Sequence, residues 1–315
     1  MKKHVVVVVV VVAIWALAAQ AGGKRPYNQG AGSNAPAKAI EQRVTVDKDT
    51  GKREVEDVVV NRPIQRDGNG NAQGSQYDLA VDGAFDGQTV AVLHFYPFDF
   101  SAPQAALKEK GFSVFRWISN PPPPAELETS LQKANQLWVI SDCSGTHLNA
   151  EHVAVIKRYF ESGHGVYIWG DNNPCYGDAN LVGKALLGVE MLGDVPGDQV
   201  VGIQKNGKGA GVVANHLIST GVETVYEGVT VATIEPNQQL TPLLYGSAGN
   251  LIAAAYDKEK RRLIFDGGFT RLYGKWDTAG TARYIKNAAA WLANVERFGD
   301  AIVADQGVST KTAKP

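Results

Sequence analysis

Three aspartates in this chain directly follow apolar segments of strand length, where a carboxylate can take part in chemistry. Asp142 follows "QLWVIS", Asp171 follows "GVYIWG", and Asp266 follows "RRLIF". Carboxylates that crowd together repel one another unless a metal ion, a proton or a basic group neutralises them. The three acids therefore predict a polar ligand site or, because Asp often caps helices and turns, three capped loops.

The segment "DCSGT" adds hydroxyl groups to the first of these acids. The spacing of Asp142, Ser144 and Thr146 resembles the Asp-x-Ser-x-Ser/Thr motif of a von Willebrand A metal-dependent adhesion site. Hard oxygen ligands of this kind suit Mg²⁺ or Ca²⁺. That motif normally ends the first strand of its fold, whereas here it ends the third predicted strand. We expect no cofactor, and a divalent cation is the alternative.

Two more polar residues complete the predicted site. Asn172 adjoins Asp171, and Arg271 follows Asp266 closely enough to pair with an acid and neutralise the cluster without a metal. The aromatic residues of "FTRLYGKWD" could stack on a sugar or pack in the core. No catalytic residue and no metal ligand is assigned. The predicted ligand-binding residues are Asp142, Ser144, Asp171, Asn172, Asp266 and Arg271.

Strand and helix segments alternate from Thr89 onward, and this order places the acids at one edge. The first four strands are continuous apolar segments, typical of a parallel sheet buried on both faces. Ligands bind outside the carboxyl ends of the strands in such sheets. Asn149 is a natural N-cap for a helix over 150–162, shorter strands follow Gly188, and one helix is expected over 280–298. The predicted fold class is α/β and flavodoxin-like, with helices on both faces of a parallel sheet and a late antiparallel extension.

The N-terminus has the three-part pattern of a secretory signal peptide. Two lysines precede an apolar run over 5–19, and Ala19-Gln20-Ala21 is a small-x-small cleavage signal. The alternative is an uncleaved anchor, although the run is short for a membrane span of about 20 residues. We expect a periplasmic or extracellular protein with no membrane span after cleavage. The predicted division is a signal peptide over 1–21, a flexible linker with a β-hairpin over 22–87, the α/β domain over 88–299 and a mobile tail over 300–315.

The charge and the cysteines narrow the chemistry further. The formal net charge of −1 over 315 residues provides no basic excess, so we do not expect a nucleic-acid partner. Cys143 and Cys175 follow consecutive strands, so both lie at the same edge, and a disulfide forms if their Cα atoms approach within about 7 Å. Export favours this disulfide. Alternatively, Cys143 and His147 form a nucleophile–base pair.

The element order and two longer segments resemble the class I glutamine amidotransferase-like superfamily, in its ThuA-like or related branches. These segments are "ESGHGVYIWGDN" and "LIAAAYDKEKRRLIFDGGFTRL", and the resemblance covers about 89–298. It implies an amidotransferase-like sheet, a cysteine nucleophile at the sharp turn after the fourth strand, and a His-x-Glu pair after a late strand. Here the first place reads Gly170-Asp171-Asn172 and the second reads Asp266-Gly267-Gly268.

These departures define the functional expectation. Neither the thiol nor the imidazole stands where the resemblance places it, so glutamine hydrolysis by the family mechanism is not expected. The leading hypothesis is an exported, non-catalytic domain that binds a small molecule, a glycan or an envelope protein at an acidic strand-end pocket. One alternative is a cysteine- or carboxylate-dependent hydrolase that acts on an envelope or glycan substrate. Another is a metal-dependent adhesion module.

Overall fold

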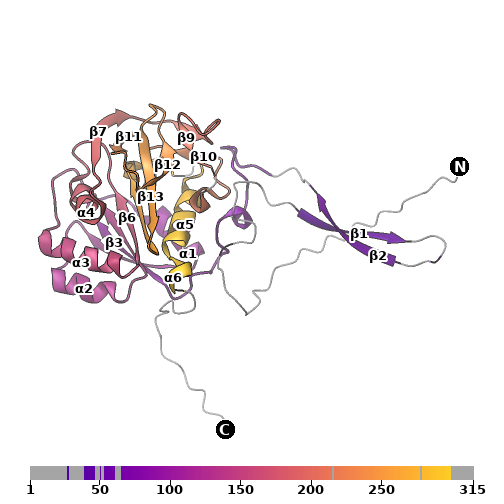
Figure 1. Cartoon of the computed structure of the whole chain (residues 1–315), viewed down its shortest axis with the longest axis horizontal. Coiled ribbons are helices and arrows are strands. Elements are labelled where there is room, and N and C mark those ends of the chain that lie inside the picture. Colours follow the sequence, from indigo (N-terminus) through magenta and orange to yellow (C-terminus); the bar gives the residue numbers. More distant parts are fainter. Residues whose placement is uncertain are drawn as a thin grey trace, which may run out of the picture.

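The computed structural model describes residues 27, 39–46, 50, 53–60, 65–214, 216–276 and 279–298 (Figure 1). The predicted signal peptide and the predicted tail lie outside these residues. The helices and strands are β1 (Ala39–Val46), β2 (Arg53–Val60), η1 (Ser75–Tyr77), β3 (Thr89–His94), α1 (Ser101–Glu109), β4 (Ser113–Ile118), α2 (Pro124–Leu131), β5 (Gln136–Ile140), α3 (Ala150–Glu161), β6 (Gly165–Trp169), α4 (Gly177–Leu187), β7 (Met191–Pro196), β8 (Val200–Gly202), β9 (Gly211–Val212), η2 (Leu217–Ser219), β10 (Thr224–Tyr226), β11 (Thr230–Ile234), β12 (Thr241–Tyr245), β13 (Leu251–Lys258), β14 (Arg261–Asp266), η3 (Phe269–Leu272), α5 (Thr281–Leu292) and α6 (Val295–Phe298).

A central eight-stranded sheet organises the domain, in the order β4-β3-β5-β6-β14-β13-β12-β9. The first five strands pair in parallel, and β13, β12 and β9 continue the sheet in antiparallel fashion. The fold class is therefore the predicted one, a mixed α/β fold with a parallel sheet and a late antiparallel extension. Smaller antiparallel pairs are formed by β1 with β2, by β10 with β8 and by β11 with β7.

Helices cover both faces of the sheet because its strands bury both sets of alternating side chains. Trp138 and Trp169 pack into one core together with residues of α1 and α5. Val139 and Ile168, their neighbours along β5 and β6, pack into the other core together with residues of α2, α3 and α4 (Figure 1). Asn149 caps α3 as predicted, because its side chain accepts the backbone N–H groups of the first turn.

Part of the segment that the sequence assigns to a linker packs into the domain. Within 65–87, Leu79 and Phe85 are buried in the core that includes α1 and α5. Asp78 is also buried and forms ion pairs with three cations, Lys110, Arg283 and Lys286, at 2.8, 2.8 and 3.0 Å. The sequence predicts a linker here because the contacts are made by a few apolar residues and one carboxylate. These residues do not recur with the period of a helix or a strand.

The C-terminal helix also differs from the sequence expectation of one element over 280–298. It divides into α5 and α6 at Asn294, whose φ of 53° is left-handed. The side chain of Asn294 donates hydrogen bonds to the carbonyl groups of Gly163 and Lys260, at 2.8 Å each. These contacts hold the break between the two helices. Among the described residues, no helix combines the length and the apolar character needed to cross a membrane.

Candidate functional site

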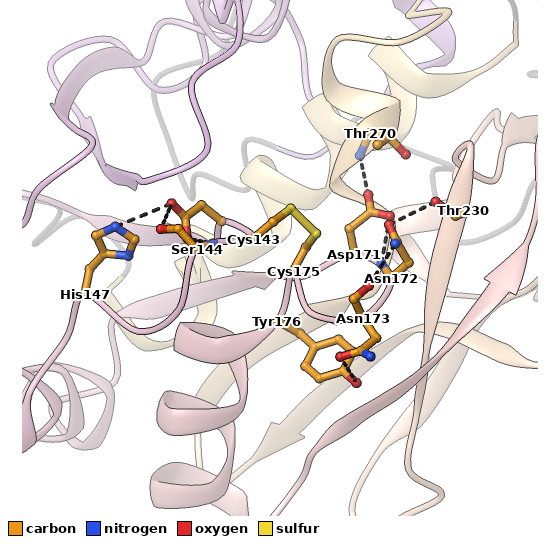
Figure 2. Close-up of a disulfide and its surroundings, with 11 residues drawn as sticks. Cys143, Ser144, His147, Asp171, Asn172, Asn173, Cys175, Tyr176, Thr230 and Thr270 are labelled. Carbon is orange, nitrogen blue, oxygen red and sulfur yellow. Dashed lines mark hydrogen bonds and ion pairs between the residues drawn. A yellow bond between two sulfur atoms is a disulfide. The ribbon is translucent and has the colours of Figure 1, made fainter.

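The carboxyl ends of β3, β5, β6 and β14 meet at one edge of the sheet because these strands are parallel neighbours. The loops that follow β5 and β6 carry most of the residues selected from the sequence. Figure 2 shows them on either side of a disulfide, with Ser144 and His147 on one side and Asp171 and Asn172 on the other.

Asp142 organises the loop after β5. Its Oδ1 accepts the backbone N–H of Ser144 at 2.9 Å, and its Oδ2 accepts the Ser144 hydroxyl at 2.8 Å. Oδ2 also lies 3.4 Å from Nε2 of His147. The carboxylate is nearly buried, whereas Ser144 is exposed. Ser144 is therefore the member of this pair that can meet a ligand directly.

The two cysteines are joined to each other. Cys143 and Cys175 form a disulfide, with their Cα atoms 4.0 Å apart, and it links the loop after β5 to the loop after β6 (Figure 2). Both cysteines of the chain are used in this bond. A sulfur atom held in a disulfide is not a thiolate nucleophile. The arrangement therefore removes the Cys143–His147 nucleophile–base pair as long as the bond is intact.

Asp171 stands at the turn between β6 and α4, where the resemblance implies a nucleophile. It has no exposed surface. Its Oδ1 accepts the backbone N–H of Asn172, and its Oδ2 accepts the backbone N–H of Thr270, each at 2.9 Å (Figure 2). Burial raises the pKa of Asp171 to about 7, because the two N–H groups only partly compensate for the loss of water. The side chain of Asn172 is half-buried, and its Oδ1 accepts the Thr230 hydroxyl at 2.9 Å.

Asp266 and Arg271 form a buried ion pair of 2.9 Å in which neither side chain has exposed surface. Oδ2 of Asp266 also accepts the hydroxyls of Tyr167 and Tyr284, each at 3.3 Å. Burial raises the pKa of Asp266 to about 6, although Arg271 opposes this effect. The second guanidinium nitrogen of Arg271 donates to the Glu227 carbonyl at 2.7 Å. The expected acid–arginine pair is thus present, in the core and not on a surface.

The structure does not bring the three acids onto one shared polar floor. Asp171 and Asp266 have no exposed surface, and each is satisfied by its own partners. Asp142 serves a separate loop. The physical reason is that each carboxylate has partners in its own surroundings: backbone N–H groups for Asp142 and Asp171, and Arg271 for Asp266. Of the six selected residues, only Ser144 and Asn172 keep substantial surface.

An aromatic patch at the same edge was largely missed from the sequence. Tyr96 and Phe98 follow β3, and Tyr273 follows η3 after β14. The ring centroid of Tyr273 lies 6.1 Å from that of Tyr96 and 4.6 Å from that of Phe98. Because β5 and β6 lie between β3 and β14 in the sheet, these contacts join loops from either side of the two central strands. The available signal was "FYPFDF", an aromatic run that directly follows the first strand of the sheet.

Tyr273, a member of this aromatic patch, lies close enough to Asp171 for the carboxylate to influence its pKa. Burial, Tyr96 and the nearby Asp171 carboxylate together raise the pKa of Tyr273, so its phenol stays neutral and can donate a hydrogen bond. Tyr273 is nevertheless 38% exposed, which leaves part of its ring available for contact. No group of three or more His, Cys, Asp or Glu side chains in the described part of the chain is arranged to hold a metal ion.

No family model matches this chain, and no curated protein sequence matches it. Solved structures do match. A GMP synthase-like protein from Thermoplasma acidophilum has 9% identity and a TM-score of 0.44, with 68% of this chain and 98% of that chain covered. A ThuA-like protein from Parabacteroides merdae has 11% identity and a TM-score of 0.43, with 71% and 93% covered. PurLQS from Thermotoga maritima has 8% identity and a TM-score of 0.39, with 65% and 98% covered. The similarity concerns the arrangement of strands and helices and does not extend to activity.

Proposed function

We propose that this protein is an exported, non-catalytic domain of amidotransferase-like fold that binds a glycan at the carboxyl edge of its sheet. Ser144, Asn172 and the aromatic patch provide the contact surface. Asp171 and Asp266 support that surface from below and do not touch the ligand.

The observation that carries this proposal is the state of Asp171. A nucleophile at a strand–helix turn needs an exposed atom and a base within reach. Asp171 has no exposed surface, and both of its oxygens already accept backbone N–H groups. The late-strand position holds Asp266, which is paired with Arg271. Both places thus carry carboxylates that stabilise loops, and we infer no glutamine chemistry from them.

The choice of a glycan follows from the side chains that remain available. Ligand sites usually combine apolar or aromatic side chains with a few polar groups that fix orientation. The aromatic patch offers partly exposed ring faces, and Asn172 and Asn173, which follow β6 at the same edge of the sheet, offer amide groups that are at least partly exposed. Neutral hydroxyl-rich molecules suit a surface that combines ring faces with amide groups.

A glycan array probed with the purified full chain tests the binding. Tyr273→Ala is expected to weaken binding by about tenfold or more, which corresponds to about 1.4 kcal/mol, because tyrosines are enriched among the few contact residues that carry most of the binding energy. Phe115→Ala is the matched control, because Phe115 is 49% exposed but lies on β4 at the outer edge of the sheet. Equal losses in the two variants, or no binding by the wild type, would contradict the proposal.

A glutaminase assay tests the non-catalytic part separately. We expect no turnover of glutamine by the purified protein, with or without a reductant. Robust turnover that disappears in Cys143→Ser would show that the reduced cysteine is a nucleophile. Export is tested by sequencing the N-terminus of the mature protein, which we expect to start at Gly22.

A further inference from the structure

Asp171 joins two segments that carry contact residues of the proposed glycan site. Its Oδ1 accepts the backbone N–H of Asn172 and its Oδ2 accepts that of Thr270, each at 2.9 Å (Figure 2). Asn172 belongs to the turn after β6, whereas Thr270 belongs to η3, which follows β14. One buried side chain therefore bridges two segments that lie 99 residues apart in the sequence.

Thr270 connects Asp171 to Tyr273 of the aromatic patch. The carbonyl group of Thr270 accepts the N–H groups of Tyr273 and Gly274, at 3.3 and 2.7 Å. Burial, Tyr96 and the Asp171 carboxylate together raise the pKa of the Tyr273 phenol, so this carboxylate also acts on Tyr273 through space. The placement of Tyr273 is therefore tied to Asp171 in two ways.

A ring of hydrogen bonds closes around Asp171. The Thr230 hydroxyl donates to Oδ1 of Asn172 at 2.9 Å. The backbone N–H of Val229 donates to Oγ1 of Thr270 at 3.0 Å. Val229 and Thr230 are consecutive residues at the start of β11. The turn after β6, η3 and the start of β11 therefore hold one another, and Asp171 is the member of this ring that carries a charge.

The burial of Asp171 decides how its charge affects this arrangement. The side chain has no exposed surface, and burial raises its pKa to about 7 although the N–H groups oppose this effect. The charged or ionisable groups that act on it are Arg271 and Tyr273, both from the segment after β14. The loss of water outweighs the hydrogen bonds and the positive charge of Arg271. Proton uptake therefore favours an arrangement that keeps Asp171 covered.

We propose that Asp171 is a positioning residue for ligand binding at this edge and that its ionisation regulates the affinity, with the neutral side chain favouring binding and the carboxylate weakening it. This inference rests on the proposed function, because Asn172 and Tyr273 are contact residues there. A ligand that covers the edge excludes water that would stabilise the carboxylate, whereas a neutral Asp171 loses little when that water leaves. Binding is therefore coupled to the uptake of a proton.

Calorimetric titration of the full chain with the oligosaccharide that ranks first on the glycan array tests this coupling. The Kd of the wild type should be lower by about fivefold or more at about pH 5.5 than at about pH 8.5. Asp171→Asn has a neutral side chain at every pH, so its Kd should be the same at the two pH values. Asp257→Asn is the matched control, because Asp257 is an exposed acid that pairs with Arg262 at the opposite end of β14, and this variant should keep the pH dependence of the wild type.

Solution NMR of the ligand-free chain keeps the test decisive if no oligosaccharide binds. The amide signals of Asn172 and Tyr273 should shift with one common midpoint near pH 7 in the wild type and without that midpoint in Asp171→Asn. Equal Kd values of the wild type at the two pH values, a pH dependence that persists in Asp171→Asn, or a Tyr273 amide that does not follow Asp171 would overturn the proposal. Absence of binding together with the common midpoint would contradict the glycan site and support Asp171 as the link between the two segments.

Discussion

Replacing Asp171 by asparagine should remove a specific pH dependence of stability. Asp171 is buried, and its pKa in the folded protein is about 7, against an ordinary value of 3.8. The folded state therefore binds a proton more tightly than the unfolded state. Stability is favoured at low pH and is lost as the pH rises through about 7. The difference amounts to about 3 kcal/mol between pH 4.5 and pH 8.

Urea unfolding of the wild type and of Asp171→Asn at these two pH values measures this difference. Asn has no titrating group, but it leaves one of the two backbone N–H donors without an acceptor, at a cost of about 1–3 kcal/mol at every pH. The free energy of unfolding of the variant minus that of the wild type should therefore be about 3 kcal/mol more favourable at pH 8 than at pH 4.5. A stability difference that does not change with pH would refute the assignment of a buried, proton-binding Asp171.

Three further variants probe other parts of the structure. Although burial opposes it, the pairing of Asp78 with Lys286 and Lys110 lowers the pKa of Asp78. Asp78→Asn should therefore lower the free energy of unfolding, measured with urea, by about 3 kcal/mol or more at pH 7 and by less near pH 3. An equal loss at both pH values would speak against the ion pairs. The disulfide closes a loop with a sequence separation of 32 residues. The free energy of unfolding of the double variant Cys143→Ala/Cys175→Ala should therefore be about 3–4 kcal/mol lower than that of the oxidised wild type and equal to that of the reduced wild type. Asn149→Ala removes the cap of α3 and should lower the free energy of unfolding by about 1 kcal/mol. An unchanged free energy of unfolding would show that the cap does not stabilise the protein.

The sheet could be predicted from the sequence because its signals are local. Continuous apolar strands such as Gly165–Trp169 indicate burial on both faces, and Asn149 marks the start of a helix without help from tertiary structure. The docking of 65–87 could not be predicted in this way. Its anchor, Asp78, finds its partners 32 to 208 residues further along the chain, at Lys110 and Lys286.

The meeting of the loops after β5 and β6 at one edge was predictable, but the contacts of the individual residues in these loops were not. The strand order correctly brought Cys143 and Cys175 to one edge, because loops after neighbouring parallel strands are close. The fate of the acids was not predictable, because it depends on the direction of single backbone N–H groups. Asp171 meets the N–H of Thr270, 99 residues later in the chain. A carboxylate that accepts such a hydrogen bond stabilises the fold and is not available to bind a ligand.

The central claim is that the strand-end edge binds a glycan and leaves it chemically unchanged. Calorimetric titration with the oligosaccharide that ranks first on the array, followed by mass spectrometry of the recovered oligosaccharide, tests this claim most directly. We predict saturable binding that is weakened in Tyr273→Ala, retained in Phe115→Ala, and accompanied by no change in the mass of the oligosaccharide. A cleaved or deacylated product, or binding that is indifferent to Tyr273→Ala, would contradict the claim.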